Sequence, residues 1–172
     1  MAERVRTVKR VDRAFAFIDL SGFTAFTDTR GDAEAVAVLA RFRALVREVA
    51  ASRAVRVSKW LGDGAMLVAI DLPTLIETVT DIVTEAPEWR IELPLRAGVA
   101  HGAVILMEGD DHIGGAVNLA ARLCDEAQPN EVLAPSAVTG EPLPANTTAR
   151  VVGHRKVRGI TTPIELVLLE AA

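Results

Sequence analysis

Cysteine, long apolar runs and blocks of like charge are all scarce in this chain of 172 residues. Its single cysteine, Cys124, cannot form an internal disulfide, which fits a reducing cytosol. No apolar run reaches the roughly 18 residues that a membrane-spanning helix needs. The basic first residues do not lead into a continuous apolar stretch with a small-residue cleavage site, so no signal peptide is predicted. We therefore expect a cytoplasmic protein without a membrane span.

Charged residues are mixed along the chain, with 19 basic and 23 acidic side chains and a formal net charge of −4. Because neither sign is concentrated, the composition argues against a nucleic-acid-binding surface. Half of the residues are apolar, and the length suits one domain with a sizeable buried core. There is no internal repeat, linker or low-complexity segment. We expect an N-terminal tail of residues 1–13 followed by a single domain of residues 14–172.

Two short strand-like segments deliver aspartates to glycine-containing turns. Residues 14–19 form an apolar and aromatic run that ends at Asp19 and is followed by the turn sequence Ser-Gly-Phe-Thr. Further along, residues 55–60 and 65–70 flank Gly-Asp-Gly, which predicts a β-hairpin with Asp63 at its tip. Strand ends are where α/β folds tend to carry chemistry, so both aspartates are candidate functional residues.

The remaining pattern alternates between helices and strands. Helices are predicted for residues 31–51, 71–85 and 116–128, from helix-forming composition, apolar spacing and the positions of proline. Strands are predicted for residues 95–106, with a bend at His101 and Gly102, and for residues 131–134, 149–157 and 164–168. This order indicates an α+β or α/β sandwich.

Asp19 and Asp63 would lie close together if their strands are neighbours. Two such carboxylates suit Mg²⁺ or Mn²⁺, because these hard cations prefer oxygen ligands and keep positions open for phosphate. Each aspartate taken alone is more often a residue that shapes its turn. The metal hypothesis therefore depends on the pair.

Asn118 and Arg122 stand four residues apart, which places them on one face of the third predicted helix. An amide and a guanidinium aimed at the same place suit negative charge that develops on a phosphate or ribose oxygen. Most helical residues of these types are simply solvated. Lys59 and Asp111 are likewise ordinary surface residues when each is taken alone.

Taken in order, these segments resemble the class III adenylyl and guanylyl cyclases over residues 15–168. Residues 17–24 (Phe-Ile-Asp-Leu-Ser-Gly-Phe-Thr) resemble the first metal signature of that family, and residues 59–64 (Lys-Trp-Leu-Gly-Asp-Gly) resemble the second. Residues 111–123 are similar to its base-reading and transition-state motif, and residues 157–160 to its closing strand pair. The resemblance implies a ferredoxin-like βαββαβ core with additional C-terminal strands.

The resemblance also implies a role for each matching residue. The two divalent metal ions, Mg²⁺ or Mn²⁺, are assigned to Asp19 and Asp63, with the Leu20 carbonyl as a weaker ligand. The base is assigned to Lys59 and Asp111, and the ribose and transition state to Asn118 and Arg122. The phosphates are assigned to the backbone of Gly22, Phe23 and Thr24 and to a basic residue that is either Arg158 or Lys156.

The donor and acceptor pattern of the base-reading pair favours ATP. Adenine presents an acceptor at N1 and a donor at its amino group, whereas guanine presents a donor at N1 and an acceptor at O6. Lys59 can only donate and ionised Asp111 can only accept, so the pair complements adenine and mismatches guanine at both atoms. Such a polar mismatch can discriminate by up to about 10⁴-fold in a closed site.

The sequence as a whole predicts an adenylyl cyclase that forms 3′,5′-cyclic AMP and pyrophosphate by a two-metal mechanism. The resemblance implies a head-to-tail homodimer, in which the metal aspartates of one subunit face the base-reading and transition-state residues of the other. A guanylyl cyclase and a non-catalytic nucleotide-binding regulatory module are the alternatives. An aspartyl-phosphate phosphatase is disfavoured, because Ser21 stands where that chemistry needs a second aspartate.

Overall fold

The structure, a computed structural model, describes residues 8–107, 109 and 111–172. The helices are α1 (Phe23–Arg30), α2 (Asp32–Ser52), α3 (Leu72–Glu85) and α4 (Gly115–Glu126), with a short 3₁₀ helix η1 (Ser136–Gly140). The strands are β1 (Arg10–Leu20), β2 (Arg56–Leu61), β3 (Gly64–Ala69), β4 (Leu95–Leu106), β5 (His112–Ile113), β6 (Val132–Pro135), β7 (Thr147–Arg155) and β8 (Ile164–Ala171).

The strands form a mixed sheet in the order β2-β3-β1-β4-β6-β8-β7, with β5 paired to β4. β1 lies between β3 and β4 and is antiparallel to both, while β4 and β6 are parallel. Strands β1 to β4 with α2 and α3 make the ferredoxin-like core, and β6, β8 and β7 extend the sheet from β4. The predicted α+β fold is confirmed, including the additional C-terminal strands.

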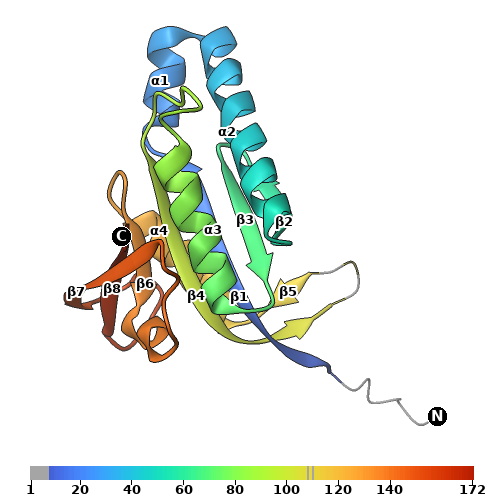
Figure 1. The fold of residues 1–172 in the computed structure, drawn as a ribbon, viewed down its shortest axis with the longest axis vertical. Coiled ribbons are helices and arrows are strands. Elements are labelled where there is room, and N and C mark those ends of the chain that lie inside the picture. The colour runs from blue at the N-terminus through green and yellow to red at the C-terminus, as the bar shows by residue number, and fades with distance from the viewer. Residues whose placement is uncertain (1–7, 108, 110) are drawn as a thin grey trace.

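The two faces of β1 are buried against different helices. Ala14, Ala16 and Ile18 belong to the larger core cluster beneath α2 and α3, which lie side by side over one face of the sheet (Figure 1). Phe15 alternates to the other face and packs in a second cluster with Ala120 of α4. Burying an aliphatic or aromatic side chain stabilises the fold by roughly 1.5–3 kcal/mol, so both helix layers are held mainly by apolar contact.

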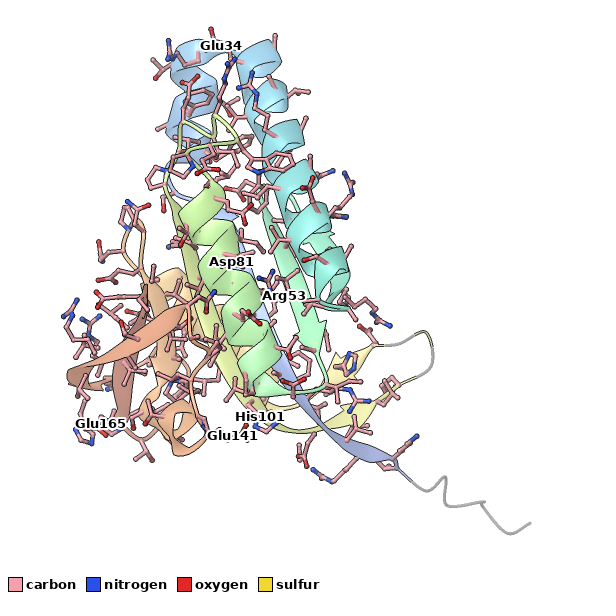
Figure 2. The ribbon with its side chains drawn as sticks, in the orientation of Figure 1. Glu34, Arg53, Asp81, His101, Glu141 and Glu165 are labelled. Atoms are coloured by element: carbon pink, nitrogen blue, oxygen red, sulfur yellow. The ribbon has the colours of Figure 1, made fainter. Side chains whose placement is uncertain are left out.

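Polar contacts join α2, α3 and the start of β7. Arg53, which follows α2, forms ion pairs with Asp81 and Glu77 of α3; Arg53 and Asp81 are labelled in Figure 2. Asn146, just before β7, donates to the Asp81 carboxylate at 2.7 Å. The C-terminal end of α2, the middle of α3 and the start of β7 are therefore joined.

Helix α4 approaches the sheet most closely at Gly98 of β4. A Cβ atom added there would lie 2.2 Å from the Ala120 carbonyl oxygen and 2.3 Å from the Cys124 amide nitrogen. Both are backbone atoms of α4, so no side-chain movement could relieve the overlap. Gly98 thus permits the close packing that fixes the position of α4 on the sheet.

The structure differs from the sequence prediction at three places. β1 begins at Arg10, so residues 10–13 pair with β4 rather than forming part of a tail. Helix α1 follows the predicted turn directly; it has no buried residue and too little amphipathic pattern to be recognised from sequence. β4 keeps an unbroken register with β1 through His101 and Gly102, where a bend was predicted.

Among the described helices, none is long and apolar enough to cross a membrane.

Candidate active site

Asp19 and Asp63 are brought together where β1 ends beside the β2-β3 hairpin. Asp19 is paired with Gly64 across the β1-β3 ladder, and the Leu20 amide donates to the Asp63 carbonyl at 3.1 Å. A Cβ atom added at Gly64 would lie 2.8 Å from the Ile18 carbonyl oxygen and 3.0 Å from the Asp19 Cβ. Glycine at this position therefore allows the hairpin to approach the end of β1.

The surroundings of Asp63 disfavour its ionised form. Burial, and in addition the negative charge of Asp19, raises the pKa of Asp63 above its ordinary value. A backbone hydrogen bond and the positive charge of Arg96 act in the opposite direction but only partly offset this. A bound cation would favour the ionised form of Asp63 and so stabilise this site.

Arg96 on β4 completes this group and was not identified from the sequence. It lies directly opposite Asp19 in the β1-β4 register. Its Nε and Nη2 atoms donate to the two carboxylate oxygens of Asp19 at 2.8 and 3.2 Å. The hydrogen bond with Asp19 in turn raises the pKa of the guanidinium, which stays charged.

The donor set around Asp19 fits a hard divalent cation. A cavity of about 160 Å³ is lined by Asp19, Gly64, Cys124 and Asp125, among others. The nearby Ser21 hydroxyl oxygen is buried without a hydrogen-bond partner in the described part of the chain. Burial raises the pKa of the Cys124 thiol, so it stays neutral and contributes no charge. No group of three or more acidic, histidine or cysteine ligands occurs among the described residues, so water, backbone or phosphate oxygens would complete the coordination.

Lys59 and Asp111 form a second charged group. The Lys59 Nζ lies 2.7 Å from Asp111 Oδ1, and both side chains are about half exposed. The hydrogen bond from Lys59 lowers the pKa of Asp111, which is therefore ionised at neutral pH. The structure thus joins the two residues assigned to the base, with one as a pure donor and the other as a pure acceptor.

The residues assigned to the ribose and transition state lie on α4. Asn118 and Arg122 are both exposed and one turn apart. The Arg122 Nη1 lies 3.9 Å from the Asp125 carboxylate, and its Nε would be 3.6 Å from a Cβ atom at Gly159. The connection between β7 and β8 therefore passes beside Arg122, and Arg158, which precedes Gly159, is exposed in that connection.

The backbone assigned to the phosphates lies at the start of α1. Gly22 precedes the helix with φ of 75°, a left-handed conformation that glycine adopts without strain. Phe23 and Thr24 occupy the first turn, where amide groups have no acceptor within the helix. The Ser21 amide is already engaged, since it donates to the Pro94 carbonyl at 2.8 Å.

Curated relatives include a named adenylate cyclase, while no protein-family model matches the chain. An uncharacterised protein of Mycobacterium tuberculosis is 34% identical over 158 residues, which cover 92% of this chain and 41% of that protein. The pH-sensitive adenylate cyclase of the same species is 33% identical over 156 residues, which cover 88% of this chain and 38% of that protein. The chain thus spans about two fifths of the length of these relatives.

The crystal structure of the adenylyl cyclase CyaB from P. aeruginosa matches with a TM-score of 0.84, covering 97% of each chain at 17% sequence identity. This chain has the fold of the class III nucleotidyl cyclase catalytic domains. Guanylyl cyclases occur among the matching structures as well. The cyclase fold by itself therefore does not select between ATP and GTP.

Within this cyclase-like fold, the candidate residues fall into separate groups. Asp19 and Asp63 meet with Arg96 in one group, and Lys59 and Asp111 meet in another. In the part of the chain that the structure describes, no hydrogen bond or ion pair links the two groups. Arg96 could have been found from sequence only with the β1-β4 register in hand, because nothing in its local sequence marks it as a partner of Asp19.

Proposed function

We propose that this domain is an adenylyl cyclase that converts ATP to 3′,5′-cyclic AMP and pyrophosphate and thereby acts in signal transduction. The observation that carries the proposal is the placement of Asp19 and Asp63 side by side at the end of β1, where Asp19 pairs with Gly64 and the Leu20 amide donates to the Asp63 carbonyl. Relatives of 33% and 34% identity that are named adenylate cyclases support it. We assign the catalytic unit to residues 10–172, since β1 begins at Arg10, and an enzyme that uses ATP would act in the cytoplasm.

Asp19 and Asp63, with the Leu20 carbonyl as a further ligand, would hold two divalent ions, Mg²⁺ or Mn²⁺. Bound there, these cations supply Lewis-acid activation of the ribose hydroxyl and neutralise the triphosphate. Arg96 holds the Asp19 carboxylate in place through its two hydrogen bonds. The two parallel donors of this guanidinium would also suit a phosphate oxygen of the substrate.

Lys59 and Asp111 would read the base without breaking their own ion pair. The lysine ammonium has three donors, and one of them is used by Asp111 at 2.7 Å. A second can reach N1 of adenine, while the other carboxylate oxygen of Asp111 accepts from the adenine amino group. Guanine would present a donor to the lysine and an acceptor to the carboxylate, and it is disfavoured at both contacts.

The reaction is an in-line displacement at the α-phosphorus of ATP. The ribose 3′ oxygen forms the new bond to phosphorus and gives up its proton to solvent water, while the bond to the bridging oxygen of pyrophosphate breaks. Asn118 would orient the ribose, and Arg122 would donate to the charge that develops on the transferring phosphate. The amides of Gly22, Phe23 and Thr24, with Arg158, would hold the remaining phosphate oxygens.

The separation of the two charged groups favours composite sites in a homodimer. Within one chain, no hydrogen bond or ion pair among the described residues links the aspartate group to the base-reading group. A second copy in head-to-tail arrangement would bring Lys59, Asp111, Asn118 and Arg122 of one subunit to Asp19 and Asp63 of the other. Two equivalent sites would result.

The purified chain, incubated with ATP or with GTP in Mg²⁺ or Mn²⁺, tests the function directly. We expect cyclic AMP as the main product, and a Lys59→Met variant with a smaller preference for ATP over GTP. Cyclic GMP as the main product would instead identify a guanylyl cyclase. Tight ATP binding with no cyclic product in either metal would contradict catalysis and indicate a regulatory module.

A further inference from the structure

The hairpin that carries Asp63 rests on α2 through a stacked aromatic residue. Trp60 is half-buried on β2, immediately before the turn. The guanidinium groups of Arg43 and Arg47, one turn apart on α2, lie 5.3 and 4.9 Å from the centre of its indole ring. Contacts of this kind between a cation and an aromatic face are attractive, and they strengthen as the groups are removed from water.

Arg43 makes one contact that Arg47 does not. Its Nη2 donates to the Gly62 carbonyl at 3.3 Å. Its Nε is buried without a hydrogen-bond partner in the described part of the chain, so indole and carbonyl together define where this guanidinium sits. Among the described residues, Arg47 makes no hydrogen bond or ion pair and contacts the hairpin only through the ring.

The carbonyl that Arg43 holds belongs to the residue directly before Asp63. Gly62 has a φ of 61°, as a tight two-residue hairpin turn with glycine at its first central position requires. Glycines on both sides of Asp63 make the turn easy to deform. Two hydrogen bonds from outside the hairpin restrain it: the Leu20 amide to the Asp63 carbonyl at 3.1 Å, and Arg43 to the Gly62 carbonyl.

Asp63 depends on this restraint because its side chain has little else to fix it. In the described part of the chain the Asp63 carboxylate forms no ion pair, whereas the Asp19 carboxylate forms an ion pair with Arg96. Without a cation, the neighbouring charge of Asp19 would push Asp63 away. A turn that is free to move would take the second carboxylate out of reach of a shared ion.

We propose that Arg43 is a positioning residue, which braces the Asp63 turn against α2 through the Gly62 carbonyl and the Trp60 ring and thereby sets the affinity of the site for its divalent cations. This role rests on the proposed cyclase function. It assigns a task in cation binding to a residue on the opposite side of the hairpin from the base-reading pair.

The test compares Arg43→Leu with Arg47→Leu, which removes a guanidinium from the same ring and the same helix but no hydrogen bond to the turn. For Arg43→Leu we expect the Mn²⁺ concentration at half-maximal rate to rise by about tenfold, the size of one hydrogen bond to a charged group. The maximal rate should recover at saturating Mn²⁺. Arg47→Leu should change the Mn²⁺ requirement by less than about twofold, and Arg43→Lys, which can still donate, should lie between.

Two readouts do not depend on turnover. Hydrogen exchange should speed up in residues 60–64 of Arg43→Leu and not of Arg47→Leu, and direct Mn²⁺ binding should weaken only in the former. In a Trp89→Phe background, Trp60 emission should respond to both substitutions, which shows that each has altered the stack.

Equal Mn²⁺ requirements in the two leucine variants, or a rate loss that Mn²⁺ cannot restore, would overturn the proposal. If the wild-type chain makes no cyclic nucleotide, the proposed cyclase function is wrong, but hydrogen exchange and Mn²⁺ binding still test the role of Arg43. If Arg43→Leu does not fold, Arg43→Lys is compared with Arg47→Leu in its place.

Discussion

Asp19 has two charged neighbours with opposite effects, the guanidinium of Arg96 and the carboxylate of Asp63. The bidentate contact with Arg96 neutralises and orients Asp19 before any cation binds. Asp63 is left with a raised pKa, caused first by burial and then by Asp19. The unfavourable charge of the pair is therefore concentrated at Asp63, and this determines how the protein should respond to pH and to metal.

Replacing Asp63 with asparagine should abolish turnover and raise stability when no divalent cation is present. Because the folded-state pKa of Asp63 lies above its unfolded value, its ionisation lowers stability as the pH rises through that folded pKa. The neutral amide removes this cost. We expect a higher melting midpoint for Asp63→Asn than for wild type at pH 7 with a chelator, and a difference that shrinks as the pH falls.

Metal and an unrelated aspartate supply the controls for this substitution. Mn²⁺ should raise the melting midpoint of the wild type but leave Asp63→Asn unchanged, because only the former has both carboxylates. Asp28→Asn, at an exposed position on α1, should show neither effect. An Asp63→Asn variant that is less stable than wild type in chelator at pH 7 would contradict the electrostatic account.

At the scale of elements, α4 must lie close to the sheet for its exposed residues to reach a nucleotide. The contact at Gly98 brings the backbone of α4 against β4, and Arg96 reinforces it by donating to the Asp125 carbonyl at 3.0 Å. Asn118 and Arg122 are carried by the same helix. Their position is thus set by a glycine that has no chemistry of its own.

Gly98→Ala should destabilise the fold and displace α4. A Cβ atom would overlap two backbone atoms of α4 at 2.2 and 2.3 Å, so the helix has to move as a body. Overpacking a core costs about 1–3 kcal/mol when side chains can adjust, and we expect the upper end or more here. Chemical denaturation measures the loss. Gly140→Ala, where an added Cβ meets nothing within 4 Å, is the matched control and should stay within about 0.5 kcal/mol of wild type.

At the scale of the whole molecule, the candidate functional residues form two separate groups rather than one closed pocket. The aspartate group lies at the end of β1, and the base-reading pair joins β2 to the loop before β5. A homodimer with shared sites would complete both. This arrangement predicts that damage to one group can be compensated by an undamaged partner.

Mixing two inactive chains tests the shared site. Asp19→Ala and Arg122→Ala should each be inactive alone, the latter through loss of roughly 3 kcal/mol of transition-state stabilisation. In a mixed dimer one site carries both substitutions and the other carries none. With random pairing, the equimolar mixture should recover about a quarter of wild-type activity. Continued inactivity of the mixture, with dimers present by sedimentation, would contradict composite sites.

The sequence alone identified most of the candidate functional residues and most of the elements that hold them. Periodicity and turn chemistry were sufficient for α2, α3, α4 and the β2-β3 hairpin, because each depends on local composition and on glycine or proline at its ends. Pairs of residues at fixed spacing, such as Asn118 and Arg122, were readable for the same reason. The roles of these residues remain predictions.

The tertiary structure alone decided which distant residues meet. The ion pair between Arg96 and Asp19 depends on the register of β1 against β4. The hydrogen bond from Arg43 to the Gly62 carbonyl depends on how α2 packs on the hairpin. The short helix α1 has no fully buried residue, and only Phe23 and Phe26 pack partly against the core, so its apolar pattern is too weak for prediction. Register and packing result from burial summed over the whole chain, whereas a local segment specifies only its own backbone preference.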